Sequence, residues 1–140
     1  MRIAAKSAFC ATGYARIGLS GDYGIAWLLT RTIGSSRARE LMFTAERVDA
    51  DRCERIGLVN RVVDDARLRD EAFALARSLA EGPRIAYRNI KDNLDDALHI
   101  DYPTALHREA ERLVQASRTA DHKEAVQAFV EKRKPVFSGR

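Results

Sequence analysis

One carboxylate, Asp22, lies in a glycine-rich turn where its chemistry could serve catalysis. Gly18 and Gly21 favour a tight turn, and Ser20 and Asp22 are its polar side chains. An apolar pattern with helical spacing begins after Gly24, so the turn is expected to lead into a helix N-terminus. Unpaired backbone N–H groups and the helix dipole stabilise a carboxylate there, which suits Asp22 as a helix cap or as an ionised base.

The other residues that could carry chemistry lack suitable partners in the sequence. Ser20 has neither the strand-to-helix elbow of a hydrolase nor a histidine placed by its spacing. His99, His107 and His122 form no close pair with another histidine or a cysteine, so we expect no metal site. The glycines do not make a phosphate loop, because no Gly-Lys-Ser or Gly-Lys-Thr follows them.

The composition is that of an ordinary globular protein. Of the residues, 46% are hydrophobic and 31% are charged. A length of 140 residues corresponds to one domain or part of one. The sequence contains no run of 18 apolar residues, so we expect no membrane span. The apolar part of residues 1–6 is too short for a signal peptide. Cys10 and Cys53 have neither metal-type nor disulfide-type spacing, so we expect two reduced, partly buried thiols in a cytoplasmic protein.

The net charge of +4 does not by itself predict nucleic acid as a partner. Positive residues are interleaved with acidic ones, as in Arg108-Glu-Ala-Glu-Arg112, which is typical of a solvated helix face. The concentrated basic run, residues 132–134, could meet a phosphorylated small molecule as easily as a nucleic acid. No aromatic residues are interleaved with it for base stacking, so we expect no nucleic-acid function.

The periodicity predicts three short strands and about seven helices. Strands are expected over residues 2–5, 8–10 and 58–63, and helices over 22–33, 35–43, 49–57, 68–79, 83–94, 102–117 and 121–132. Ser35 or Ser36 is expected to cap the second helix and Asp49 the third, which Gly57 ends. Asp121 with Glu124 resembles a capping box for the last helix.

The amphipathic helices need a covering partner, because the predicted strands are too few to cover their apolar faces. Exposed apolar surface of that extent favours association. We therefore expect the chain to form a homo-oligomer.

A series of motifs in one order and spacing resembles the enoyl-CoA hydratase/isomerase (crotonase) superfamily. The motifs are Phe9, Ile17-Gly-Leu-Ser-Gly-Asp22, Tyr23-Gly24, Leu28-Leu-Thr-Arg31, Gly34 to Leu41, Ala50 to Val63, Lys91, and Phe129 to Phe137. They cover nearly the whole chain and match only the second half of such a protein. The resemblance implies an α/β fold, in which the C-terminal part of a crotonase-type ββα spiral is followed by a mostly helical tail. Residues 1–63 would be the remnant of the spiral core with its active-site loop, and residues 64–140 the oligomerisation region.

The resemblance also implies roles for three residues near the turn. Asp22 matches a position where several family branches carry a catalytic aspartate. Gly13 falls where hydratases carry their second glutamate, so Asp22 with Gly13 favours isomerase-like proton transfer over hydration. Tyr14 matches a pocket-lining position in some branches, although packing alone would also explain an aromatic residue there. The oxyanion-hole donors and the first glutamate would lie upstream of Met1, so we expect the 140-residue chain to be inactive by itself.

At the C-terminal end, Phe129 and Lys132 match the segment that meets the adenine and phosphate part of coenzyme A. A basic helix end that complements the macrodipole would explain the same residues. The resemblance implies no prosthetic group, with coenzyme A entering only as part of the substrate.

The family resemblance therefore implies an enzyme of acyl-CoA metabolism, which includes fatty acid metabolism. It would act on an enoyl-CoA thioester through an enolate-type intermediate, as a trimer or hexamer. The alternative is a shortened, non-catalytic chain that associates with itself or with a full-length family member.

Overall fold

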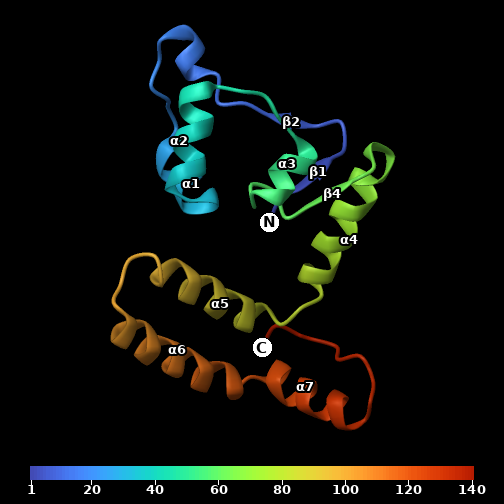
Figure 1. The fold of residues 1–140 in the computed structure, drawn as a ribbon. Helices are drawn as coiled ribbons and strands as arrows, with labels where there is room; N and C mark the ends of the chain where they lie inside the picture. The colour runs from blue at the N-terminus through green and yellow to red at the C-terminus, as the bar shows by residue number, and fades with distance from the viewer. The chain divides into compact units, whose positions relative to one another are not determined.

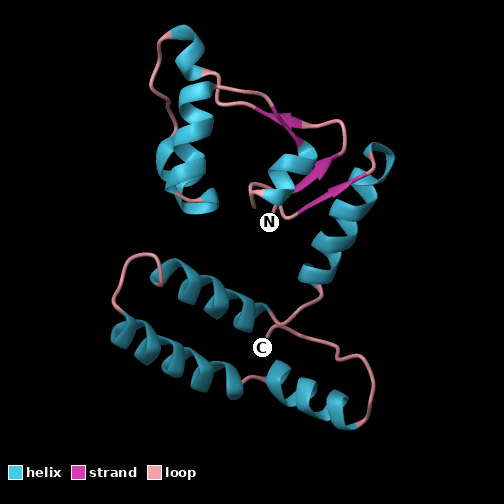
Figure 2. Ribbon diagram, viewed as in Figure 1, coloured by secondary structure: helices cyan, strands magenta, loops and turns pink.

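The structure, a computed structural model, describes residues 1–140 and separates into two compact units, Met1–Ala74 and Leu75–Arg140. The elements in chain order are β1 (Ile3–Ala5), β2 (Phe9–Cys10), the 3-10 helix η1 (Tyr14–Ile17), α1 (Ile25–Ile33), α2 (Ser35–Thr44), β3 (Val48–Asp49), α3 (Ala50–Arg55), β4 (Arg61–Val63), the 3-10 helix η2 (Asp65–Arg67), α4 (Leu68–Ala80), α5 (Arg84–Asp96), α6 (Tyr102–Ser117) and α7 (Ala120–Val130). The predicted α/β class with a mostly helical second part is confirmed (Figures 1 and 2).

Two small sheets organise the first unit. β1 pairs with β4 in parallel, with Ile3 opposite Arg61, although the two strands are far apart in the sequence. β2 pairs with β3 antiparallel, with Cys10 opposite Val48. The sequence pattern did not predict β3, because two residues are too few to show an alternating pattern.

The core of the first unit is a cluster of buried side chains from α1, α2, β3 and α3. Its members are Leu29, Ile33, Ala38, Leu41, Val48 and Cys53, with Met42, Ile56, Leu58 and Val59 packed against them. α1 and α2 lie side by side in Figure 1 and make the most extensive helix contact of this unit. The core therefore fixes α1, and with it the turn that precedes α1.

The ends of α3 are as predicted. Asp49 is the N-cap, and its carboxylate Oδ1 accepts a hydrogen bond from the backbone N–H of Arg52 at 2.7 Å. At the other end Gly57 adopts the left-handed conformation, with φ of 79°. Hydrogen bonds from Gly57 N to Glu54 O and from Leu58 N to Cys53 O close the helix in a Schellman motif.

The starts of α1 and α7, and the cap of α2, differ from the prediction. α1 begins at Ile25 with Gly24 as its N-cap, because Tyr23 and Gly24 both have positive φ, and a helix cannot extend back through them. α2 begins at Ser35, and its N-cap is Gly34, with no side chain bonded to the helix end. α7 is capped by Thr119, whose hydroxyl accepts a hydrogen bond from His122 N at 3.0 Å, and not by Asp121.

The last strand and one helix start are also displaced. β4 spans only three of the six residues expected for it, because residues 56–60 are taken up by the turn that ends α3. Pro83 is the N-cap of α5 and not its first helical residue.

The second unit contains residues 75–80 of α4, the antiparallel helices α5 and α6, then α7 and a C-terminal tail (Figure 1). None of its large apolar side chains is buried. Asp121 is buried instead, and with Glu124 it binds the tail. The tail runs back to the start of α5, where Arg84 donates to Ser138 O at 3.0 Å (Figure 1).

Both cysteines are unpaired, as predicted, but they are not alike. Cys10 is exposed and Cys53 is buried, so the prediction of two partly buried thiols was wrong. Burial, and then the neighbouring Cys10, raise the pKa of Cys53 to about 11. No helix is both long and apolar enough to cross a membrane.

Candidate active site

The turn around Asp22 is a loop that runs from Gly13 to Gly24. Gly13 has φ of 68° and sets the start of η1, and Gly18 ends η1 with φ of 72°. The backbone N–H of Leu19 then donates to Tyr14 O at 3.0 Å, which folds the second half of the loop back onto the first. The positive φ values explain why glycine occupies these positions, since other residues are strained there.

The loop brings two predicted site residues together. The Tyr14 hydroxyl donates a hydrogen bond to Asp22 Oδ1, across eight positions of sequence. This hydrogen bond, with partial desolvation and the negative charge of Asp22, raises the pKa of the Tyr14 phenol above its ordinary value. Tyr14 is half-buried and Asp22 is exposed, so the carboxylate faces open space.

The structure overturns the reading of Asp22 as a helix cap. Its side chain bonds to Tyr14 and not to the N-terminus of α1. Only its backbone carbonyl takes part in the helix start, where it accepts from Ile25 N at 3.0 Å. The carboxylate is therefore not required for helix α1 to form.

A cavity of about 470 Å³ lies beside the loop in the first unit. Its lining residues are mostly apolar: Phe9, Cys10, Ala11, Thr12, Tyr14, Ile25, Leu29, Leu41, Glu46, Val48 and Leu58. Tyr14 thus contacts both Asp22 and the cavity, whereas Gly13 is not among the lining residues. Such a cavity can take an apolar chain.

The predicted coenzyme A residues belong to the second unit. Phe129, at the end of α7, is 84% exposed. Lys132 follows it with φ of 55° and forms no ion pair. The next two basic residues do: Arg133 pairs with Glu124 at 2.5 Å, and Lys134 with Glu81 at 3.0 Å. Within the basic run, Lys132 is thus the residue whose ammonium has no ion-pair partner.

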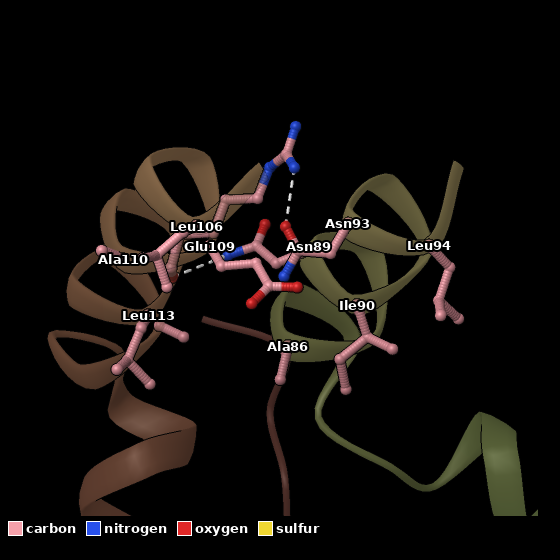
Figure 3. A pocket seen from close by; sticks show the side chains of 11 residues that line it. Ala86, Asn89, Ile90, Asn93, Leu94, Leu106, Glu109, Ala110 and Leu113 are labelled. Atoms are coloured by element: carbon pink, nitrogen blue, oxygen red, sulfur yellow. Dashed lines mark hydrogen bonds between the residues drawn. The ribbon is translucent and has the colours of Figure 1, made fainter. Parts of the chain in front are cut away.

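A second cavity, of about 630 Å³, is a groove between α5 and α6. Ile90 and Leu94 line it from α5, and Leu106 and Leu113 from α6, as Figure 3 shows. Asn89 also lines the groove and is buried, and its side-chain amide donates to Arg112 O at 3.1 Å. The sequence predicted the apolar faces but not this groove, which depends on how the two helices cross.

Two hydrogen-bonded arrangements, one in the loop and one at the C-terminal tail, could not be predicted from the sequence. The hydrogen bond between Tyr14 and Asp22 has no sequence signal, because it depends on the loop conformation. The second is the binding of the tail by Asp121 and Glu124, since the same two residues also fit a capping box. No group of three or more histidine, cysteine, aspartate or glutamate side chains is arranged to hold a metal ion.

The chain is similar to known proteins over its whole length. The family model "Enoyl-CoA hydratase/isomerase" matches residues 1–140. The chain is 38% identical over 140 residues to the 1,2-epoxyphenylacetyl-CoA isomerase of Escherichia coli (strain K12), covering 99% of this chain and 53% of that relative. It is 34% identical over 134 residues to the short-chain-enoyl-CoA hydratase of Clostridium acetobutylicum, covering 96% of this chain and 51% of that relative.

A solved structure gives the same result for the fold. The crystal structure of enoyl-CoA hydratase from Bacillus anthracis matches with a TM-score of 0.94 and 33% identity, over 100% of this chain and 54% of that one. This likeness confirms the crotonase-type fold predicted above. The chain spans about half the length of the curated relatives it matches.

Proposed function

Because the chain belongs to the enoyl-CoA hydratase/isomerase family, we propose that it supplies the acid/base half of an enzyme acting on an acyl-CoA (enoyl-CoA) thioester. The observation that carries the proposal is the exposed carboxylate of Asp22 on the loop, bonded to Tyr14 and not used as a helix cap. An ionised carboxylate that faces open space can remove a proton from carbon next to a thioester. The reaction then passes through an enolate-type intermediate.

The loop favours isomerisation over hydration. Hydration needs a group that activates water, and Gly13, at the position where the family resemblance expects a glutamate, has no side chain to do so. Asp22 alone can take a proton from one carbon of the acyl chain and return it to another. The apolar cavity beside Tyr14 suits the acyl chain.

Coenzyme A would bind through the second unit. Exposed Phe129 offers a stacking face for an adenine ring, and the unpaired ammonium of Lys132 offers a contact for a phosphate. The alternative, a basic helix end that complements the dipole, finds less support, because the last turn of α7 contains no basic residue. In this proposal residues 1–63 hold the active-site loop, and residues 64–140 serve assembly and coenzyme A.

The groove between α5 and α6 supports assembly into a homo-oligomer. Leu94 and Leu113 line it and are 65% and 72% exposed. Apolar surface of that kind is covered in a stable protein, either by further copies or by a full-length family member. The second candidate function, a non-catalytic chain that only associates, rests on this same groove. We further propose a cytoplasmic location, where both thiols remain reduced.

The test compares Asp22→Asn with the unaltered sequence after fusion to the first half of a family member. Asp22→Asn is expected to lower the rate of isomerisation of an unsaturated acyl-CoA about 100-fold or more. The thermal midpoint is expected to stay unchanged, because Gly24 and not Asp22 caps α1. Asp64→Asn, an exposed substitution elsewhere in this unit, is the matched control. Equal, measurable rates for Asp22→Asn and the unaltered fusion would rule out Asp22 as the base. A folded fusion without any turnover would favour the non-catalytic, associating chain.

A further inference from the structure

We propose that Tyr14 is the positioning residue of Asp22: its hydroxyl holds the carboxylate in one orientation and leaves Oδ2 to exchange the proton with the substrate. The inference rests on the proposed function, because it assigns a partner to the base of that reaction. It differs from the role predicted for Tyr14 from the sequence, which was to line the substrate pocket.

The loop is built so that these two side chains meet. Gly13 turns the chain at the start of η1, and the Leu19 N to Tyr14 O bond of 3.0 Å closes the loop at the backbone. The side-chain bond from Tyr14 to Asp22 closes it a second time. An exposed aspartate otherwise samples several rotamers, and a bond to a half-buried ring selects one of them.

The direction of the hydrogen bond suits a base that must stay ionised. Tyr14 donates to Oδ1, so the lone pairs of Oδ2 remain for the substrate. In the reaction the C–H bond of the substrate breaks and its proton bonds to Oδ2, while the electron pair passes toward the thioester carbonyl. The proton then returns to another carbon of the acyl chain and the double bond shifts. Tyr14 keeps its own proton throughout, because the adjacent carboxylate disfavours the phenolate.

The pair is tested first in the 140-residue chain, without any substrate. Each of the four tyrosines is labelled with ¹³C at the ring carbon that bears oxygen, and their pKa values are followed by NMR. Tyr14→Phe assigns the signal. The Tyr14 phenol is expected to titrate above 10, and Asp22→Asn is expected to return its pKa toward 10. Asp64→Asn, the matched loss of one exposed carboxylate in this unit, is expected to leave the Tyr14 pKa where it is.

The second measurement is kinetic and uses the fused enzyme described above. Tyr14→Phe keeps the ring against the cavity and removes only the hydroxyl, so it is expected to lower kcat about tenfold with little change in KM. In the Asp22→Asn background the same substitution is expected to cause no further decrease in kcat, because the carboxylate that Tyr14 positions is already absent. Tyr102→Phe, at an exposed tyrosine of α6, is the control.

The outcomes separate the two proposals. The positioning role is overturned if the Tyr14 pKa does not change in Asp22→Asn. It is also overturned if Tyr14→Phe lowers kcat as much in the Asp22→Asn background as in the unaltered fusion. In both cases Asp22 remains the base. A fused enzyme whose rate does not depend on Asp22 overturns the proposed function, and the positioning role with it, whatever the Tyr14 titration shows. An Asp22-dependent Tyr14 pKa together with a non-additive loss in kcat supports both.

Discussion

The carboxylate of Asp121 accepts a hydrogen bond of 2.7 Å from the backbone N–H of Ser138, which is seventeen positions later in the sequence. The same oxygen accepts from the Ser138 hydroxyl at 3.2 Å, and both oxygens accept from Gly139 N. Burial by itself would raise the pKa of Asp121, but the N–H groups of Ser138 and Gly139 lower it below its ordinary value. Asp121 therefore anchors the C-terminal tail to α7.

Asp121→Asn is expected to release the tail. An asparagine keeps one acceptor oxygen, but its amide NH₂ would face backbone N–H groups that need acceptors. Buried donors without an acceptor raise the free energy of the folded state. Hydrogen exchange at the Ser138 and Gly139 amides is expected to rise about tenfold or more. Asp95→Asn, at an exposed position of α5, is the control and should leave both amides protected. Unchanged protection in Asp121→Asn would mean that other contacts hold the tail.

Glu124 makes the same tail sensitive to acid. Its pKa is lowered to about 2, because the Arg133 guanidinium and the backbone N–H of Val136 both bond to its charged form. A carboxylate with a depressed pKa stabilises the fold fully above its ordinary value, near 4.5, and the stabilisation is lost as the pH falls toward 2. The NMR shift of the Val136 amide is expected to move across that range. In Glu124→Gln this movement should disappear, and its persistence would assign it to another group.

The cap of α3 offers a direct measure of stability in the first unit. Asp49→Ala is expected to lower the free energy of unfolding by about 1 kcal/mol, because it leaves the Arg52 N–H without an acceptor. Asp49→Asn keeps the acceptor and is expected to remain close to the unaltered chain. Urea unfolding followed by circular dichroism measures both. A loss in Asp49→Asn as large as that in Asp49→Ala would show that charge, and not capping, matters here.

The groove between α5 and α6 predicts association of the chain with itself. Light scattering at micromolar concentration is expected to give a mass above that of one chain, because the exposed leucines of the groove need cover. Leu94→Gln with Leu113→Gln is expected to lower that mass. Phe43→Gln, at an equally exposed position of α2, is the control. A compact, stable monomer of the unaltered chain would contradict the prediction.

The 140-residue chain alone is expected to show no hydratase activity on a short 2-enoyl-CoA. It spans about half the length of its relatives, and loss of even one oxyanion donor typically costs about 10²–10³ in rate. Gly13 also supplies no group to activate water. Saturable turnover above the buffer rate, by protein shown to be free of host enzymes, would refute this.

Several features of this protein follow from the sequence by itself. The apolar spacing placed all seven helices, and the family resemblance named the fold. Asp49 and Gly57 were assigned as the ends of α3 because caps depend on residues within a few positions of each other, which the sequence displays directly. Helix caps and side-chain periodicity depend on residues that are close together in the chain, so they can be predicted from a single sequence.

The hydrogen-bond partner of each acidic side chain depends on how the chain folds in space. Asp22 and Asp121 both had the position and the residue type of a cap, but their carboxylates bond to Tyr14 and to Ser138. A carboxylate accepts from whichever donor the folded chain brings within reach. The left-handed residues Tyr23 and Gly24 rotate the loop so that Asp22 meets a phenol in place of the α1 N-terminus. The return of the tail brings the Ser138 N–H to Asp121, and neither approach has a signature in the spacing of residues along the chain.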